Sequence, residues 1–251
     1  MARVIVITSG KGGVGKSTIT CNLGYSLANF NNKVLLIDAD LGLKNLDILM
    51  NLESRIIYDI GDLIKGRCSI EQAIVQDRHY SNLFLLPASL RLDIEYFDPS
   101  YLKKIINQVD SQFDFILIDC PAGIEKGFLN AIKYAKEALL VVTLDKASIK
   151  DSDKVVGILK SNSISNIKIV INKYNERDIE RNNSLLIEDV VYVLNQEIIG
   201  VIKENKNFIV VANNHKKREK NADSEDLAMS ILGIDKKKKN SIFSRIIKRK
   251  N

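Results

Sequence analysis

The feature that most constrains this chain is a glycine-rich loop placed between an apolar run and an amphipathic stretch. Residues 10–17 read Gly-Lys-Gly-Gly-Val-Gly-Lys-Ser, which matches the phosphate-loop pattern GxxxxGK[ST]. The apolar run Val4–Thr8 precedes the loop, and residues 17–30 follow it with helical periodicity. A strand, a glycine loop and a helix in this order predict a phosphate-binding unit.

The residue types of this loop suit a nucleoside triphosphate. Glycines let the backbone wrap closely, so that its N–H groups face phosphate oxygens. Lys16 is expected to neutralise the β- and γ-phosphates of ATP, and Ser17 to ligate Mg²⁺. The expected nucleotide-binding residues of the loop are Gly10, Lys11, Gly12, Gly13, Val14, Gly15, Lys16, Ser17 and Thr18.

Short apolar runs rich in valine and isoleucine alternate with amphipathic stretches along the chain. The runs are Val4–Thr8, Val34–Asp38, Leu83–Leu86, Phe115–Asp119, Leu139–Thr143, Ile167–Ile171 and Ile198–Ile202. The helix candidates are 17–30, 100–110, 126–136, 148–161, 184–195 and 224–232. This alternation predicts an α/β fold, a single P-loop NTPase domain over 1–235 with a mainly parallel sheet flanked by helices. Ligands should then bind beyond the carboxyl ends of the strands.

Three aspartates stand at the ends of two of these runs. Asp119 ends an apolar run, as the acidic residue of a Walker B strand does, and is expected to hold Mg²⁺ through water. Asp40 would orient the attacking water, and Asp38 would support the metal shell. The alternative for each carboxylate is a capping role in the following turn. Cys120 follows Asp119 without a histidine nearby, which favours a packing role.

The loop resembles the deviant Walker A motif of the ParA/MinD family of ATPases, because a second lysine stands at position 11. In that family the additional lysine reaches the phosphates of a partner subunit, so the resemblance implies an ATP-dependent homodimer and a catalytic role for Lys11. The chain is thereby expected to be a Mg²⁺-dependent ATP hydrolase stimulated by a partner. Lys11, Lys16 and Asp40 are the expected catalytic residues.

Further segments resemble the cell-division branch of the same family. They are Asp-Ala-Asp-Leu-Gly-Leu-Lys-Asn-Leu-Asp (38–47), Leu-Leu-Pro-Ala-Ser (85–89), Cys-Pro-Ala-Gly-Ile-Glu (120–125), Asp-Ser-Asp (151–153) and Ile-Gly-Val-Ile (199–202). The resemblance implies division-site placement, with a MinC-like inhibitor and a MinE-like topological factor as partners. It also implies an adenine contact for Asn172. Lys203 and the run 215–219 depart from the family pattern, which has proline-containing segments there.

The C-terminal residues 236–251 form a separate feature. Eight of the 37 lysines and arginines lie there without an acidic residue, so the remainder carries 29 basic and 31 acidic side chains. At 100° per residue, Ile242, Phe243, Ile246 and Ile247 share one face, while Arg245 and Lys248 flank or oppose it. This pattern predicts a basic amphipathic helix that binds an anionic membrane surface. A disordered solubilising tail and a nucleic-acid-binding tail are the alternatives.

Three other functional classes compete with this interpretation. A ParA-type DNA-partition ATPase shares the loop, but the near-neutral body disfavours it, and we expect no specific nucleic-acid partner. An iron–sulfur carrier needs paired cysteines, whereas Cys21, Cys68 and Cys120 stand far apart. A nucleotide-gated scaffold with negligible turnover remains open. The residues before Val4 show no secretory or transit pattern. The expected location is the cytoplasm and inner membrane of a bacterium, or the stroma and inner envelope of a plastid.

Overall fold

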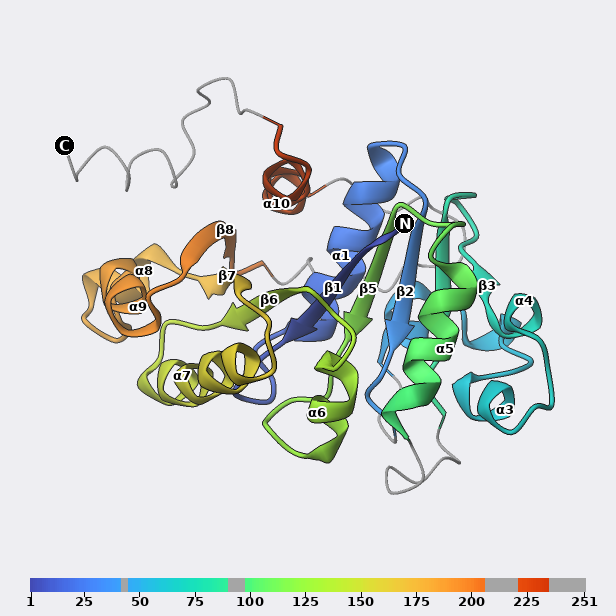
Figure 1. The fold of residues 1–251 in the computed structure, drawn as a ribbon. Helices are drawn as coiled ribbons and strands as arrows, with labels where there is room; N and C mark the ends of the chain where they lie inside the picture. The colour runs from blue at the N-terminus through green and yellow to red at the C-terminus, as the bar shows by residue number, and fades with distance from the viewer. Residues whose placement is uncertain (42–44, 90–97, 206–220, 235–251) are drawn as a thin grey trace.

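The computed structural model describes residues 1–41, 45–89, 98–205 and 221–234, and an eight-stranded sheet runs through its centre (Figure 1). The strands are β1 (Arg3–Thr8), β2 (Val34–Asp38), β3 (Val75–Gln76), β4 (Leu83–Leu86), β5 (Phe115–Asp119), β6 (Glu137–Val142), β7 (Asn166–Tyr174) and β8 (Glu197–Lys203). Their order across the sheet is β3-β4-β2-β5-β1-β6-β7-β8. All neighbouring pairs are parallel except β3 with β4. The predicted mainly parallel sheet is confirmed.

Helices cover both faces of the sheet (Figure 1). The helices are α1 (Lys16–Asn29), α2 (Leu46–Met50), η1 (Glu53–Arg55), α3 (Ile60–Ile64), α4 (Ile70–Ala73), α5 (Pro99–Val109), α6 (Lys126–Ile132), α7 (Lys146–Ser161), α8 (Glu176–Glu180), α9 (Ile187–Leu194) and α10 (Ala222–Leu232). The apolar side chains of α1, α2 and α10 pack on one face. Those of α3, α4, α5, α6, α7 and α9 pack on the other.

The sequence of β2 is continuously apolar because both faces of this strand are buried. Val34 and Leu36 belong to the core on the α1 side, whereas Leu35 and Ile37 belong to the core on the α5 and α7 side. All four side chains are fully buried. Successive side chains of a strand point to opposite faces, so a strand covered on both faces needs apolar residues at every position.

All seven predicted strands and all six predicted helices are present, with ends shifted by a few residues. The sequence does not predict β3, α8 or the short helical elements between residues 46 and 73, because elements of two to five residues are too short to establish a period. The expected helix 184–195 begins later, at Ile187. The run 215–219, part of the 38–47 segment and the tail 236–251 lie outside the described residues. The proposed domain boundary after 235 therefore stays a prediction.

The last described helix ends at the amino edge of the sheet. Arg3, at the start of β1, donates from Nη1 to the backbone oxygen of Ile231 near the end of α10 (2.5 Å). The same guanidinium group pairs with Glu137 at the start of β6. The carboxyl edge of the strands, where parallel sheets bind ligands, therefore lies at the opposite end of the strands. Among the described helices, none has the length and apolar content that crossing a bilayer requires.

Candidate nucleotide-binding site

The loop between β1 and α1 has an open concave backbone. Gly13 and Gly15 have φ angles of 75° and 92°, in the left-handed region that side chains other than glycine rarely adopt. A Cβ atom at Gly15 would lie 2.3 Å from Asn172 Nδ2, so the close approach of β7 also requires glycine there. At Gly12 and Gly13, by contrast, no atom lies within 4 Å of such a Cβ. The backbone of the loop is therefore exposed to an approaching ligand.

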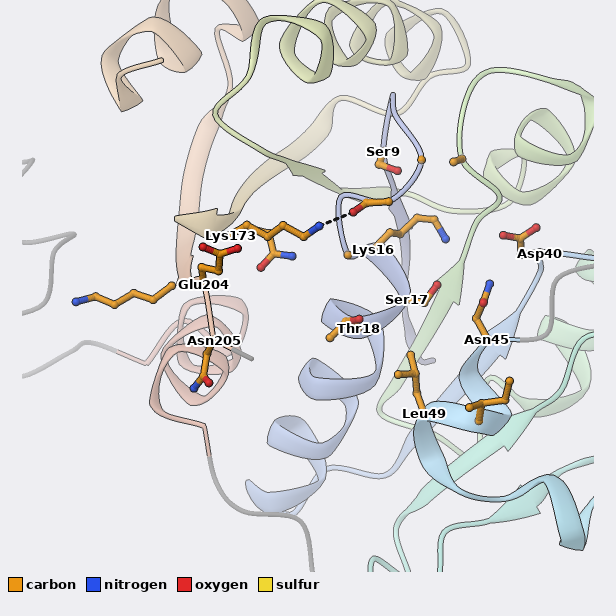
Figure 2. A pocket seen from close by; sticks show the side chains of 17 residues that line it. Ser9, Lys16, Ser17, Thr18, Asp40, Asn45, Leu49, Lys173, Glu204 and Asn205 are labelled. Carbon is orange, nitrogen blue, oxygen red and sulfur yellow. Dashed lines mark hydrogen bonds between the residues drawn. The ribbon is translucent and has the colours of Figure 1, made fainter. Parts of the chain in front are cut away.

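A hollow of about 660 Å³ opens beside this loop (Figure 2). Such a volume is within the usual range for small-molecule sites. The loop and α1 line one side, and residues that follow β2 and β5, together with the carboxyl ends of β7 and β8 and the residues after β8, complete the wall. Its lining residues are Ser9, Gly12, Gly13, Gly15, Lys16, Ser17, Thr18, Asp40, Asn45, Ile48, Leu49, Ala122, Asn172, Lys173, Lys203, Glu204 and Asn205.

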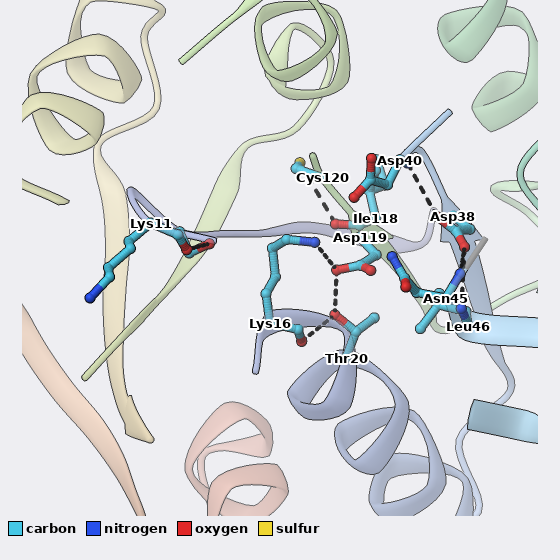
Figure 3. A network of polar contacts seen from close by, with 11 residues as sticks. Lys11, Lys16, Thr20, Asp38, Asp40, Asn45, Leu46, Ile118, Asp119 and Cys120 are labelled. Carbon is cyan, nitrogen blue, oxygen red and sulfur yellow. Dashed lines mark hydrogen bonds and ion pairs between the residues drawn. The ribbon is translucent and has the colours of Figure 1, made fainter. Parts of the chain in front are cut away.

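Lys16 and Asp119 form a buried ion pair at the base of the loop (Figure 3). Nζ lies 2.8 Å from Oδ1, and the side chains are 7% and 0% exposed. Burial opposes the charge of Lys16, but the carboxylate of Asp119 outweighs burial and raises the pKa of the ammonium group. Thr20 donates its hydroxyl to the same oxygen at 3.1 Å. The loop lysine is thus kept charged and held in place by the end of β5.

Asp38 and Asp119 lie directly opposite each other on β2 and β5. Asp38 accepts hydrogen bonds from the backbone N–H groups of Asp40, Asn45 and Leu46. Burial and the negative charge of Asp119 nevertheless raise the pKa of Asp38 to about 7. Two carboxyl groups side by side in a buried place repel each other, and a cation between them would relieve that repulsion.

The donors around this pair fit a magnesium ion. Asp119 Oδ2 is buried and has no hydrogen-bond partner among the described residues, which leaves one carboxylate oxygen for a metal-bound water. Ser17 lines the adjacent hollow at the start of α1. Mg²⁺ usually keeps several waters and takes one or two protein carboxylates, and this donor set matches that requirement. Asp38 and Asp119 thus lie opposite each other on neighbouring strands and Ser17 lines the adjacent hollow, while their role as metal residues stays a prediction.

Asp40 borders the hollow on the side away from Lys173 (Figure 2). The side chain is half-buried. Burial raises its pKa, the positive charge of Lys16 opposes this shift, and Asp119 adds to it. Asp40 therefore lies in the wall of the hollow, and its expected role in orienting the attacking water stays a prediction.

Lys11 extends away from Lys16 and Asp119 (Figure 3). Its ammonium group pairs with Asp145 Oδ1 at 3.1 Å, and the two side chains are 45% and 42% exposed. Asp145 also caps the start of α7 by accepting a hydrogen bond from the backbone N–H of Ser148. Lys11 does not line the hollow of its own chain. Its expected role toward a partner's phosphates stays a prediction.

Asn172 and Cys120 occupy buried positions beside the loop. Asn172, the expected adenine contact, borders the hollow and donates from Nδ2 to the backbone oxygen of Val14 at 2.8 Å. Burial raises the pKa of the Cys120 thiol, which makes it a poor nucleophile and agrees with a packing role. Lys173, whose Nζ lies 2.7 Å from the backbone oxygen of Gly13, is not among the site residues that the sequence predicts. Its only sequence signal is its place next to Asn172 after a strand.

Comparisons with known proteins identify close relatives. A family model described as an AAA domain matches residues 2–171. The septum site-determining protein MinD of Synechocystis sp. is 41% identical over 213 residues, which cover 85% of this chain and 80% of that protein.

Solved structures agree with this result. The MinD cell division protein of Aquifex aeolicus is 40% identical, with a TM-score of 0.84 and coverage of 95% of this chain and 100% of that chain. A MinC:MinD complex of the same organism gives a TM-score of 0.83 at 40% identity, with coverage of 95% and 99%. MinD of Pyrococcus horikoshii, complexed with Mg-ADP, is 30% identical with a TM-score of 0.79, and covers 92% of this chain and 96% of that chain.

Proposed function

Because the chain belongs to the MinD family of septum site-determining P-loop ATPases, we propose that it switches between a free form and a membrane-bound dimer. ATP binding favours the dimer, the tail 236–251 attaches the dimer to an anionic membrane surface, and hydrolysis releases it. The observation that carries this proposal is the hollow beside the glycine loop, where the lining residue Lys16 pairs with the buried Asp119, which lies opposite Asp38 on the next strand.

Different residues in and next to the hollow bind the nucleotide and promote its hydrolysis. Lys16 leaves Asp119 to contact the β- and γ-phosphates, while Ser17 and Asp119 hold magnesium and Asp38 supports that arrangement. Magnesium, when bound, neutralises charge on the phosphate oxygens. Asp40 orients the water that attacks the γ-phosphate. Positioning and charge stabilisation account for most of the catalysis in phosphoryl transfer, so a weakly basic carboxylate suffices.

Lys11 supplies the link between ATP and dimerisation. Its present contact with Asp145 is an exposed ion pair. Exposed pairs contribute only about 0–1 kcal/mol, so releasing Lys11 toward a partner's phosphates costs little. A cation provided across a dimer interface would act as an arginine finger does.

The helix α10, the last described element before the tail 236–251, ends beside Arg3 at the amino edge of the sheet. Each basic side chain near an anionic surface contributes roughly 1 kcal/mol. A helix shorter than about 12 residues is marginal in water, so one tail binds weakly. Two tails joined in a dimer gain on the order of 10²- to 10⁴-fold in apparent affinity.

The proposed protein partners are those that membership of the family implies. The solved MinC:MinD complex supports a MinC-like division inhibitor as a partner of this chain. We extend the proposal to a MinE-like factor that stimulates hydrolysis. The location that fits this cycle is the inner membrane of a bacterium or the inner envelope of a plastid.

Vesicle sedimentation tests the proposal directly. The full chain, a chain ending at Asp235 and an Asp40→Ala chain are each mixed with anionic vesicles and Mg²⁺, with either ATP or ADP. We expect the full chain to pellet with ATP and not with ADP, and the shortened chain to remain in the supernatant. The Asp40→Ala chain should pellet with ATP and stay bound after the wild type has been released.

Three outcomes each contradict a different part of the proposal. Pelleting that is equal with ATP and ADP would make the tail a constitutive anchor and remove the nucleotide switch. A full chain that stays in the supernatant in both states would remove the membrane from the cycle. Release of Asp40→Ala at the wild-type rate would exclude Asp40 from hydrolysis.

A further inference from the structure

The strand β7 departs from regular geometry next to the glycine loop. Lys173 has a φ of 55°, which is left-handed and uncommon for a residue with a side chain. The pairing of β7 with β8 shifts register between Ile171 and Tyr174, on either side of it. Left-handed residues other than glycine persist where the surroundings impose them, and they concentrate at functional sites. This irregularity therefore calls for a specific reason.

The irregularity lets two consecutive side chains reach the same loop. Asn172 donates from Nδ2 to the backbone oxygen of Val14 at 2.8 Å. Lys173 donates from Nζ to the backbone oxygen of Gly13 at 2.7 Å (Figure 2). In a regular strand adjacent side chains point to opposite faces, so they could not both contact neighbouring carbonyl groups of one loop. The left-handed turn at Lys173 removes that restriction.

The two contacts orient the opposite side of the loop. In a trans peptide, the C=O of one residue and the N–H of the next lie in one plane and point in opposite directions. Holding the carbonyl of Gly13 toward β7 therefore turns the N–H of Val14 away from β7. Holding the carbonyl of Val14 does the same for the N–H of Gly15. Outward N–H groups of this kind are what a phosphate oxygen binds.

We propose that Lys173 is a positioning residue of the nucleotide site, which together with Asn172 clamps the glycine loop in its phosphate-binding conformation. Lys173 acts through the carbonyl group of Gly13. Its ammonium group forms a charge-assisted hydrogen bond, which is stronger than the bond of a neutral donor. The side chain itself is exposed at the rim of the hollow. This inference rests on the proposed ATPase function and adds a residue to its site.

The substitution Lys173→Asn tests the effect of the ammonium group without changing the backbone conformation at this position. Asparagine tolerates left-handed backbone well, so the turn is kept while the contact with Gly13 is lost. Lys173→Arg restores a cationic donor. Lys136→Asn, at an exposed lysine in the bend before β6, is the matched control. Dissociation constants for ATP and ADP with Mg²⁺ are measured by calorimetry, and hydrolysis is followed in single turnover at saturating ATP.

We expect Lys173→Asn to raise both dissociation constants about tenfold, as the loss of a charge-assisted hydrogen bond implies. The hydrolysis rate at saturating ATP should change by less than about twofold, since the loop contacts are made equally in the ground and transition states. Lys173→Arg should recover most of the affinity, and Lys136→Asn should match the wild type. A merely structural role would instead lower the active fraction and leave the dissociation constants unchanged.

Unchanged affinity in Lys173→Asn would overturn the inference, as would a fall in hydrolysis rate without a change in affinity. Failure of Lys173→Arg to recover affinity would also count against it. These results are distinct from a failure of the proposed function. If the wild-type chain itself did not bind ATP, the ATPase proposal would fail before any variant was compared.

Discussion

At the scale of single residues, Asp38 carries a charge that conflicts with its surroundings. Its folded pKa of about 7 lies above its ordinary value of 3.8, because burial and Asp119 both disfavour the charged form. The folded chain therefore retains a proton between these pH values that the unfolded chain loses. The contribution of Asp38 to the free energy of unfolding is then largest below about pH 4 and falls as pH rises toward 7.

We predict that Asp38→Asn flattens this pH dependence in the absence of nucleotide and Mg²⁺. The difference in unfolding free energy, wild type minus variant, should fall between pH 5 and pH 7 by up to about 1.4 kcal/mol per pH unit. Urea unfolding at several pH values measures it. The loss of one acceptor for the N–H groups of Asn45 and Leu46 shifts the variant at every pH and leaves the slope unaffected.

Asp153→Asn, at an exposed acid on α7, serves as the control and should keep the wild-type slope. Parallel curves for Asp38→Asn and the wild type would show that Asp38 is ionised throughout this range. That result would also remove the argument that a cation relieves repulsion between Asp38 and Asp119.

The part of the site that the sequence predicts consists of residues in a recognisable motif or at the end of an apolar run. Gly10 to Ser17 form a motif, and Asp38 and Asp119 end apolar strands, so chemistry and position could be inferred together. Lys173 could not be inferred, because an isolated lysine after a strand is compatible with a solvated loop. Only its φ angle and its distance to Gly13 identify it. The contact of Lys11 with Asp145 joins positions 134 residues apart, which no local pattern reveals.

At the scale of elements, the packing of α7 against the glycine loop is unusually close. A Cβ atom at Gly10 would lie 2.4 Å from the backbone carbon of Asp151 and 2.5 Å from the backbone nitrogen of Ser152. Backbone atoms cannot move aside as a flexible side chain can. The first glycine of the motif thus serves helix packing, whereas Gly13 and Gly15 serve the loop's own conformation.

We predict that Gly10→Ala destabilises the fold and Gly12→Ala does not. Overpacking costs about 1–3 kcal/mol, and for a chain of this size each kcal/mol lowers the melting temperature by roughly 2–4 °C. Gly12 is the matched control, since its Cβ would meet nothing within 4 Å. Thermal unfolding followed by circular dichroism compares the two. Equal melting temperatures would mean that α7 moves away from the loop at no cost.

Sequence periodicity predicts the long helices correctly, but it does not predict the short elements. The helices α1 and α7 have at least three turns, so their apolar faces repeat. The segment between β2 and β4 instead folds into α2, η1, α3, α4 and β3, each of five residues or fewer. The positions of such short elements depend on local capping hydrogen bonds. Asp59, for example, caps α3 by accepting hydrogen bonds from the N–H groups of Gly61 and Asp62.

At the scale of the whole molecule, the proposed attachment to a membrane depends on the apolar face expected in the tail. We predict that Ile247→Glu detaches the chain from anionic vesicles while ATP-dependent dimerisation persists. The variant loses the burial of a large apolar side chain, roughly 1.5–3 kcal/mol, and gains repulsion from the surface. Sedimentation with vesicles and light scattering with ATP measure the two properties separately.

Ser244→Glu introduces the same charge outside the apolar face and is the matched control. Its expected loss is electrostatic alone, roughly 1 kcal/mol, so it should retain more binding than Ile247→Glu. If both variants bound vesicles equally, the tail would act by charge and its apolar face would have no role. If Ile247→Glu also lost the dimer, the tail would belong to the dimer interface.

The position of α10 has a consequence for how the protein responds to its own abundance. This helix ends at the amino edge of the strands, while the nucleotide hollow lies at their carboxyl edge. The hollow and the last described helix therefore lie at opposite ends of the strands. If only paired chains hold the membrane, surface coverage rises with the square of the chain's concentration. A modest change in expression would then move the protein between an almost bare and a densely covered membrane.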